Sequence, residues 1–245
     1  MYDETDAERY DDDNASVSTA EVLDPMLDVL VGLAGPGRVL EFASGTGRVT
    51  VPLAGRGVDV AGIELSPHMT RKLHEKISAE RVRVVVGDMA TATAPHVGDY
   101  SLVFLVFNTI SNLRTQSEQV ECFRNAARHL RPGGRFLIEL WVPQLQRMAP
   151  GLQLAPMHFE DDGHLVFDTY DLATQECASH HYRPQADGSV RYGTGRFRYV
   201  WPPECDLMAQ LAGLEFESRW ACWDRSPFTS SSPSHVSVWR KPGGV

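Results

Sequence analysis

Three acidic residues follow apolar runs in the first half of the sequence: Glu41 after GRVL, Glu64 after VDVAGI and Asp88 after VRVVVG. Gly45 and Gly47 stand shortly after the first of them, in VLEFASGTGRVT. Glycine lets a backbone turn sharply and approach a ligand closely, and a carboxylate accepts hydrogen bonds from hydroxyl, amino and ammonium groups. The combination is typical of a strand that turns into a helix around a nucleotide.

The kind of nucleotide can be narrowed. A dinucleotide fingerprint places a third glycine at position 50, where this chain has Thr50. A triphosphate-binding loop needs Gly-Lys-Ser or Gly-Lys-Thr, which this sequence lacks. The glycine turn therefore favours a nucleoside ligand without phosphate. A nicotinamide-dependent oxidoreductase remains the alternative that Thr50 argues against.

The elements that must position these residues alternate along the chain. Apolar strands are predicted at 37–43, 58–64, 82–88, 100–108 and 135–141, and helices at 48–57, 66–80 and 116–130. A further helix at 202–215 and strands at 215–223 and 235–241 complete the pattern. Near-continuous apolar strands that alternate with helices predict an α/β fold with a mostly parallel, doubly wound sheet of seven strands.

The pattern changes after Trp141. Between about 150 and 200, apolar residues alternate at a period of two, and the sequences DDG and ADG supply turns. This predicts an antiparallel β insert after the fifth strand. The expected organisation is an N-terminal lid and first helix at 1–35, a core at 36–148 and 201–245, and the insert at 149–200.

The chain resembles the class I S-adenosylmethionine-dependent methyltransferases over residues 37–140. The first motif of that family, an acid followed by spaced glycines, is matched by Glu41, Gly45 and Gly47, with Ala43 where the family most often has another glycine. Its acids at the ends of the second and third strands are matched by Glu64 and Asp88. The resemblance implies a Rossmann-like methyltransferase that uses S-adenosyl-L-methionine.

The resemblance also implies roles at the cofactor. Glu41 would face the methionine ammonium, Glu64 the ribose hydroxyls and Asp88 the adenine amino group. The N-terminal Tyr-Asp pairs resemble a cofactor-covering lid, and Tyr10 is the expected contact. The complete expected set is Tyr10, Glu41, Ala43, Gly45, Gly47, Glu64, Leu65, Asp88, Met89, Phe107 and Asn108.

The insert resembles the substrate-covering β layer of actinobacterial natural-product methyltransferases. This implies methyl transfer to a nitrogen or oxygen of a small molecule or short peptide in secondary metabolism, chiefly by orienting the reactants. Asn108 and Trp141 are expected near the acceptor because each ends a strand. His180 and His181 are candidates for substrate binding and catalysis, although adjacent strand residues face opposite ways and at most one can face the site. Arg198 is expected to be free for substrate contacts.

Composition and charge argue against several other classes of protein. The chain has 245 residues and a net charge of −9, and seven acidic residues with one arginine stand in its first 13 positions. It shows no basic stripe for nucleic acid, no membrane span or signal peptide, and no cysteine spacing for a metal site. A cytoplasmic monomer or homodimer is expected. A catalytically silent binding protein on the same fold remains a second alternative, which the intact set of three acids argues against.

Overall fold

The computed structural model describes residues 2–143, 158–159 and 163–243. Its main sheet has seven strands in the order β10-β11-β5-β4-β1-β2-β3. These strands are β1 (Arg38–Phe42), β2 (Val60–Glu64), β3 (Val84–Val86), β4 (Tyr100–Leu105), β5 (Leu130–Trp141), β10 (Glu215–Trp220) and β11 (Ser234–Arg240). The first five are parallel to one another, and β11 runs antiparallel to both β5 and β10. The predicted mostly parallel sheet is confirmed.

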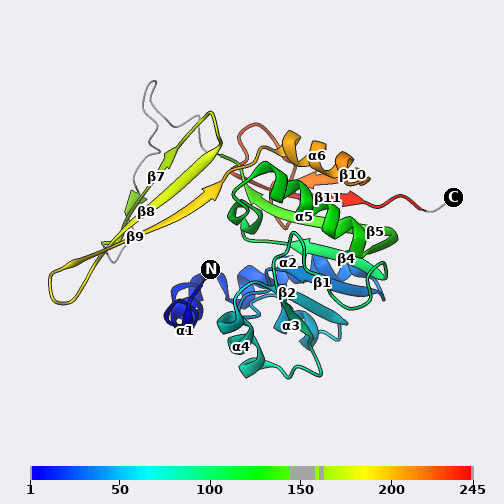
Figure 1. The fold of residues 1–245 in the computed structure, drawn as a ribbon, viewed down its shortest axis with the longest axis horizontal. Helices are drawn as coiled ribbons and strands as arrows, with labels where there is room; N and C mark the ends of the chain where they lie inside the picture. Colours follow the sequence, from blue (N-terminus) through cyan, green and yellow to red (C-terminus); the bar gives the residue numbers. More distant parts are fainter. Residues whose placement is uncertain (1, 144–157, 160–162, 244–245) are drawn as a thin grey trace.

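Helices cover both faces of this sheet (Figure 1). The helices are α1 (Glu4–Asp13), α2 (Ala20–Ala34), α3 (Thr50–Gly55), α4 (Pro67–Lys76), α5 (Gln116–His129) and α6 (Pro202–Leu211), with short 3₁₀ turns η1 (Ala15–Val17) and η2 (Thr109–Asn112). Apolar residues of α2, α3 and α4 form one core, and those of α5 and α6 form the other. A sheet that is buried on both faces explains why its strands are apolar throughout.

The sheet has its switch point between β1 and β4. The chain passes from β1 to β2 and β3 on one side, then returns to place β4 on the other side of β1. Ligands of such sheets bind beyond the carboxyl ends of the strands at this point. The loops after β1 and β4 are therefore the expected walls of a site.

Two element boundaries differ from the sequence expectation. The fourth strand, expected to continue to Asn108, ends at Leu105, because Phe107 and Asn108 have left-handed backbone angles that a strand cannot contain. The helix expected to reach residue 80 ends at Lys76, because Ile77 turns to an extended conformation and packs against the core. The residues beyond each end would suit a longer strand or helix by type, so residue types alone could not locate the last residue of β4 or of α4.

The insert forms a separate antiparallel sheet of four strands, as predicted. Its order is β6-β7-β8-β9, with β6 (His158–Phe159), β7 (Leu165–Tyr170), β8 (Glu176–Pro184) and β9 (Val190–Arg198). The β8–β9 hairpin extends away from the main sheet on the side where the N-terminal helix α1 lies (Figure 1). Among the described helices, none is long and apolar enough to cross a membrane.

Candidate active site

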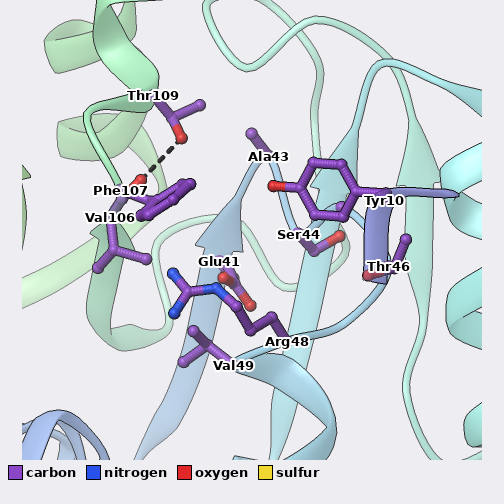
Figure 2. Close-up of a pocket in the computed structure, with 11 residues that line it drawn as sticks. Tyr10, Glu41, Ala43, Ser44, Thr46, Arg48, Val49, Val106, Phe107 and Thr109 are labelled. Atoms are coloured by element: carbon purple, nitrogen blue, oxygen red, sulfur yellow. Dashed lines mark hydrogen bonds between the residues drawn. The ribbon is translucent and has the colours of Figure 1, made fainter. Parts of the chain in front are cut away.

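A small pocket lies at the carboxyl ends of β1 and β4, at the switch point. Figure 2 shows side chains from three parts of the chain that converge there: the N-terminal helix α1, the turn after β1, and the turn after β4. The pocket is lined by Tyr10, Glu41, Ala43, Ser44, Gly45, Thr46, Arg48, Val49, Val106, Phe107 and Thr109. The pocket thus brings together five of the residues predicted to contact the cofactor: Tyr10, Glu41, Ala43, Gly45 and Phe107.

The turn after β1 has the backbone that its glycines allow. Gly45 and Gly47 have φ values of 55° and 87°, and a Cβ on Gly47 would approach Val51 Cγ2 to 2.7 Å. Ala43 has a φ of 54° without the freedom of glycine. Left-handed backbone costs an alanine about 1–2 kcal/mol, so the surrounding fold must hold this turn. Gly47 does not line the pocket; it lets α3 and α4 pack closely.

Glu41 is held deep in the pocket. Its side chain is 3% exposed, and Thr50 Oγ1 donates a hydrogen bond to its Oε2. Burial raises the pKa of Glu41 to about 8, while the Thr50 hydrogen bond and the Arg48 charge oppose that rise. A buried carboxyl with a raised pKa lacks a full counter-charge, so it can receive a ligand ammonium group. The Thr50 position, where a dinucleotide site has glycine, here orients the acid.

Arg48 is a pocket residue that the sequence reasoning missed. Its guanidinium lies 4.8 Å from the centre of the Phe107 ring, and its Nη1 donates to the Val17 carbonyl oxygen at 3.2 Å. Figure 2 shows it beside the Glu41 carboxylate and against the ring. The signal was a cation directly after the glycine turn, GTGR, which can pair with a ligand carboxylate.

Glu64 ends β2 next to the same turn. Its Oε2 accepts from the Gly45 backbone N–H and its Oε1 from the Ser66 N–H, each at 2.8 Å. Burial, the dominant influence, raises the pKa of Glu64, and these hydrogen bonds oppose it. Each carboxylate oxygen has two lone pairs, so one per oxygen is still available for a ribose hydroxyl.

The expected adenine contacts lie at the next strand end. Asp88 Oδ1 accepts from the Ala90 N–H at 2.7 Å, which orders the turn after β3. Met89 is 7% exposed and belongs to the core, whereas Leu65 is 43% exposed. These three residues do not line the pocket described above. They lie after β2 and β3, the strands beyond β1 in the sheet order.

The N-terminal helix α1 docks beside the glycine turn. Asp11 pairs with Lys76 of α4 at 2.5 Å and accepts from Thr46 Oγ1 at 2.6 Å, and Glu4 pairs with Arg71 at 2.9 Å. The Tyr10 hydroxyl is directed toward Ala43 (Figure 2). Burial raises the pKa of Tyr10 to about 12, so the phenol stays protonated and acts as a donor.

The turn after β4 forms the opposite wall. Phe107 lines the pocket, and its ring meets that of Trp141 edge to face, with centroids 6.2 Å apart. Trp141 is 59% exposed, and its backbone N–H donates to Asn108 Oδ1 at 3.4 Å. The predicted acceptor residues Asn108 and Trp141 therefore lie together at the rim.

The two adjacent histidines face opposite sides of the insert, as the alternation predicts. His180 stacks on Phe167, with centroids 4.8 Å apart, and contacts the Tyr192 hydroxyl at 2.7 Å. His181 contacts His164 at 3.0 Å. Its neighbour on the same face, Arg183, reaches Asp13 of α1 at 3.6 Å. The His181 face is thus the one that looks toward the lid helix.

The placement of Arg198 argues against the expectation that this side chain is free for substrate. It is 5% exposed at the base of the insert. Its guanidinium donates to Gln119, to Gln175 at 2.9 Å and to Glu204 at 2.8 Å. Period-two alternation placed it on a polar face, but that face is covered by α5 and α6 where the insert leaves the core. Arg198 is therefore a structural residue that joins insert and core.

The residues present fit an S-adenosylmethionine-like ligand. The buried Glu41 can receive an ammonium group, Glu64 retains lone pairs for hydroxyls, and Arg48 can receive a carboxylate. Ser44, which also lines the pocket, has a buried hydroxyl with no hydrogen-bond partner in the described chain. That hydroxyl packs against Gly62 of β2, where an added Cβ would approach it to 2.6 Å, so the fit to the ligand rests on the two acids and Arg48. No group of three or more metal-binding side chains occurs among the described residues.

The comparisons with known proteins agree with this geometry. Residues 39–134 match the family model of a methyltransferase domain. The CcbJ methyltransferase of Streptomyces caelestis is 37% identical, with 89% of each chain covered and a TM-score of 0.79. The cypemycin N-terminal methyltransferase of a Streptomyces species is 28% identical over 97% of this chain and 96% of that protein.

A third likeness concerns the fold. CalS10, an amino pentose methyltransferase of Micromonospora echinaspora with S-adenosylmethionine bound, is 19% identical with a TM-score of 0.69, and 90% of each chain is covered. The sheet order, the β insert and the 37% identity to the Streptomyces caelestis methyltransferase over 89% of each chain all indicate the same family. The chain belongs to the class I S-adenosylmethionine-dependent methyltransferases, and among them it resembles those of actinobacterial natural products.

Proposed function

We propose that this enzyme transfers the methyl group of S-adenosylmethionine to an amine nitrogen of a small natural product or short peptide. The lining of the pocket carries the proposal. Among its described residues, the only side chain with a carboxylate is Glu41, which is buried beneath Arg48 and bonded to Thr50. Tyr10 keeps its proton because its pKa is raised to about 12.

The chemistry of an amine suits such a site. The cofactor supplies a methyl group on a positively charged sulfur, which is open to in-line attack. A neutral amine attacks with its own lone pair and needs no strong base, whereas a hydroxyl gains from a positioned base. The protein's part is then to align the acceptor and exclude water, which can be worth several kcal/mol of the barrier.

The individual roles follow from the contacts. Glu41 faces the methionine ammonium, Arg48 pairs with the methionine carboxylate, and Glu64 accepts from the ribose hydroxyls. Tyr10 covers the cofactor from α1. Phe107, Asn108 and Trp141 form the rim on which the acceptor lies. The names of several relatives support a nitrogen acceptor, including the cypemycin N-terminal methyltransferase and a glycopeptide N-methyltransferase.

A panel of acceptors tests the proposal. The full-length protein is incubated with S-adenosylmethionine and matched pairs of compounds. In two pairs a hydroxyl replaces the amine, as in amino sugars and sugars or anilines and phenols, and in the third, peptides with free and acetylated N-termini, the amine is blocked. Mass spectrometry should find the extra methyl group on amines only. Methylation confined to hydroxyl compounds would contradict the nitrogen assignment. Calorimetry with S-adenosylhomocysteine and with NAD separates this enzyme from an oxidoreductase, and methylation of an acceptor in the panel separates it from a catalytically silent binding protein.

A further inference from the structure

The turn after β4 has an unusual backbone at the edge of the pocket. Phe107 and Asn108 are consecutive and both left-handed, with φ values of 59° and 58°. Asparagine tolerates this conformation, but a bulky residue such as phenylalanine rarely adopts it. Such a conformation persists only where neighbouring groups hold it, and it is most common at functional sites.

The group that holds this turn is Glu139 of β5. Leu105 and Ile138 form the last pair of the β4–β5 ladder, and Glu139 is the next residue. Its Oε2 accepts from the Phe107 backbone N–H at 2.9 Å, and its carbonyl oxygen accepts from the Asn108 N–H at 3.3 Å. One residue thus accepts hydrogen bonds from both left-handed positions.

The Glu139 carboxylate is itself fixed. Its other oxygen, Oε1, accepts from Trp223 Nε1 at 2.7 Å, and Trp223 is packed in the core on the α2 side of the sheet. Both oxygens therefore accept from rigid donors. A charged acceptor that is held in this way makes shorter and stronger hydrogen bonds than a neutral one.

The turn decides where the Phe107 ring lies. With the left-handed backbone, the ring lies in the pocket, 4.8 Å from the Arg48 guanidinium, and its edge meets Trp141. If Phe107 returned to the strand region, its side chain would leave this position. Arg48 would then lose the ring against which it packs, at the place where we assign it to the methionine carboxylate.

We infer that Glu139 is a positioning residue of the cofactor site: its carboxylate holds the Phe107–Asn108 turn left-handed and thereby keeps the Phe107 ring against Arg48. Glu139 does not line the pocket, so it acts through the turn. This role rests on the proposed binding of S-adenosylmethionine in the pocket and does not depend on which group accepts the methyl.

A double-mutant cycle on the full chain tests this role. S-adenosylhomocysteine is titrated by calorimetry into the wild type, Glu139→Ala, Phe107→Ala and the double variant. Glu139→Ala should weaken binding roughly tenfold or more, because it removes a charge-assisted hydrogen bond that holds the turn. If Glu139 acts by placing the Phe107 ring, the same substitution should weaken binding at least threefold less when residue 107 is alanine and the ring is absent.

Two further variants make the result interpretable. Glu139→Gln keeps one acceptor oxygen and should bind between wild type and Glu139→Ala, which covers the case that the alanine variant folds poorly. Glu217→Ala removes a half-buried acid that pairs with Arg135 elsewhere on the sheet, and it should bind as wild type.

Wild-type binding by Glu139→Ala, or an equal loss with and without the Phe107→Ala substitution, would overturn the inference. Failure of the wild type to bind S-adenosylhomocysteine would instead contradict the assignment of this pocket to the cofactor.

Discussion

Glu64 and Asp59 stand at opposite ends of β2 and make a matched pair for testing the cofactor site. Glu64 closes the strand at the glycine turn, whereas Asp59 precedes the strand and forms an exposed ion pair with Arg38 at 2.9 Å. Glu64→Ala should weaken cofactor affinity by about 2–4 kcal/mol, since it removes the two charge-assisted hydrogen bonds that we propose Glu64 accepts from the ribose. Asp59→Ala should leave the affinity unchanged.

Calorimetric titration with S-adenosylhomocysteine measures both variants, and a melting curve shows whether each is folded. Glu64→Gln is the gentler companion, because an amide oxygen can still accept from one of the two backbone N–H groups that Glu64 now binds. Wild-type affinity in folded Glu64→Ala would mean that this acid only orders the turn.

The raised pKa of Glu41 predicts a pH dependence of cofactor binding. Folding favours the protonated carboxyl, so its contribution to stability is present below about pH 4.5 and is lost as the pH rises through about 8. A cofactor ammonium favours the carboxylate and lowers this pKa in the complex. Affinity should therefore rise with pH between these limits by up to about tenfold per unit, and binding should release a proton.

Calorimetry in two buffers of different ionisation enthalpy measures the protons released. The amine of S-adenosylhomocysteine also titrates, so Glu41→Gln serves as the reference: it should lose the part of the proton release that belongs to this carboxyl. The same proton release in wild type and Glu41→Gln would show that Glu41 stays protonated in the complex and does not face the ammonium.

At the scale of residues, the positions of the three acids near the strand ends could be predicted, whereas the groups that support them could not. Glu41, Glu64 and Asp88 could be found because strand ends are visible as ends of apolar runs. Thr50 and Glu139 act through side-chain hydrogen bonds to partners 9 and 32 positions away, and no local pattern reports such contacts. Arg198 was misplaced because alternation gives the face of a strand but not what covers that face.

Among the elements, the N-terminal helix α1 is held mainly by charge. Ala7 is its one buried residue, and it contacts α4 through two ion pairs, Asp11–Lys76 and Glu4–Arg71. Exposed ion pairs contribute little to stability. Deleting residues 1–13 should therefore barely change the melting temperature without ligand, but it should remove most of the stabilisation that cofactor gives, because Tyr10 is lost from the pocket.

Thermal denaturation with and without S-adenosylhomocysteine checks this prediction. A full-length control, Tyr10→Phe, separates the phenol hydroxyl from the rest of the lid. A truncated protein that is stabilised by the cofactor as strongly as the full chain would exclude a lid role. The ionic character of the docking also means that added salt should weaken it.

At the scale of the whole molecule, we expect the core to bind the cofactor and the insert to contact the methyl acceptor. The mostly parallel main sheet could be predicted because parallel strands need helical crossovers, which leave a visible alternation of strands and helices in the sequence. The orientation of the insert could not, since its base is fixed by the buried cluster of Arg198, Gln119 and Glu204. Arg198 and Glu204 lie on either side of the connection from β9 to α6, but Gln119 of α5 is 79 positions away from Arg198. That cluster sets the insert at the same end of the sheet as the lid.

This geometry predicts different roles for the two adjacent histidines. The described residues of the pocket all precede residue 110, so neither histidine should affect cofactor affinity. His181 shares its face with Arg183, which reaches the lid helix, whereas His180 is enclosed in an aromatic cluster on the opposite face. His181→Ala should therefore change the acceptor KM or kcat several-fold, and His180→Ala, the matched control, should leave both near wild type.

The measurement is steady-state kinetics with an acceptor found in the amine panel, alongside calorimetry with S-adenosylhomocysteine. Loss of cofactor binding in His181→Ala, or an acceptor effect confined to His180→Ala, would mean that the insert faces the site differently from the arrangement its contact with the lid indicates.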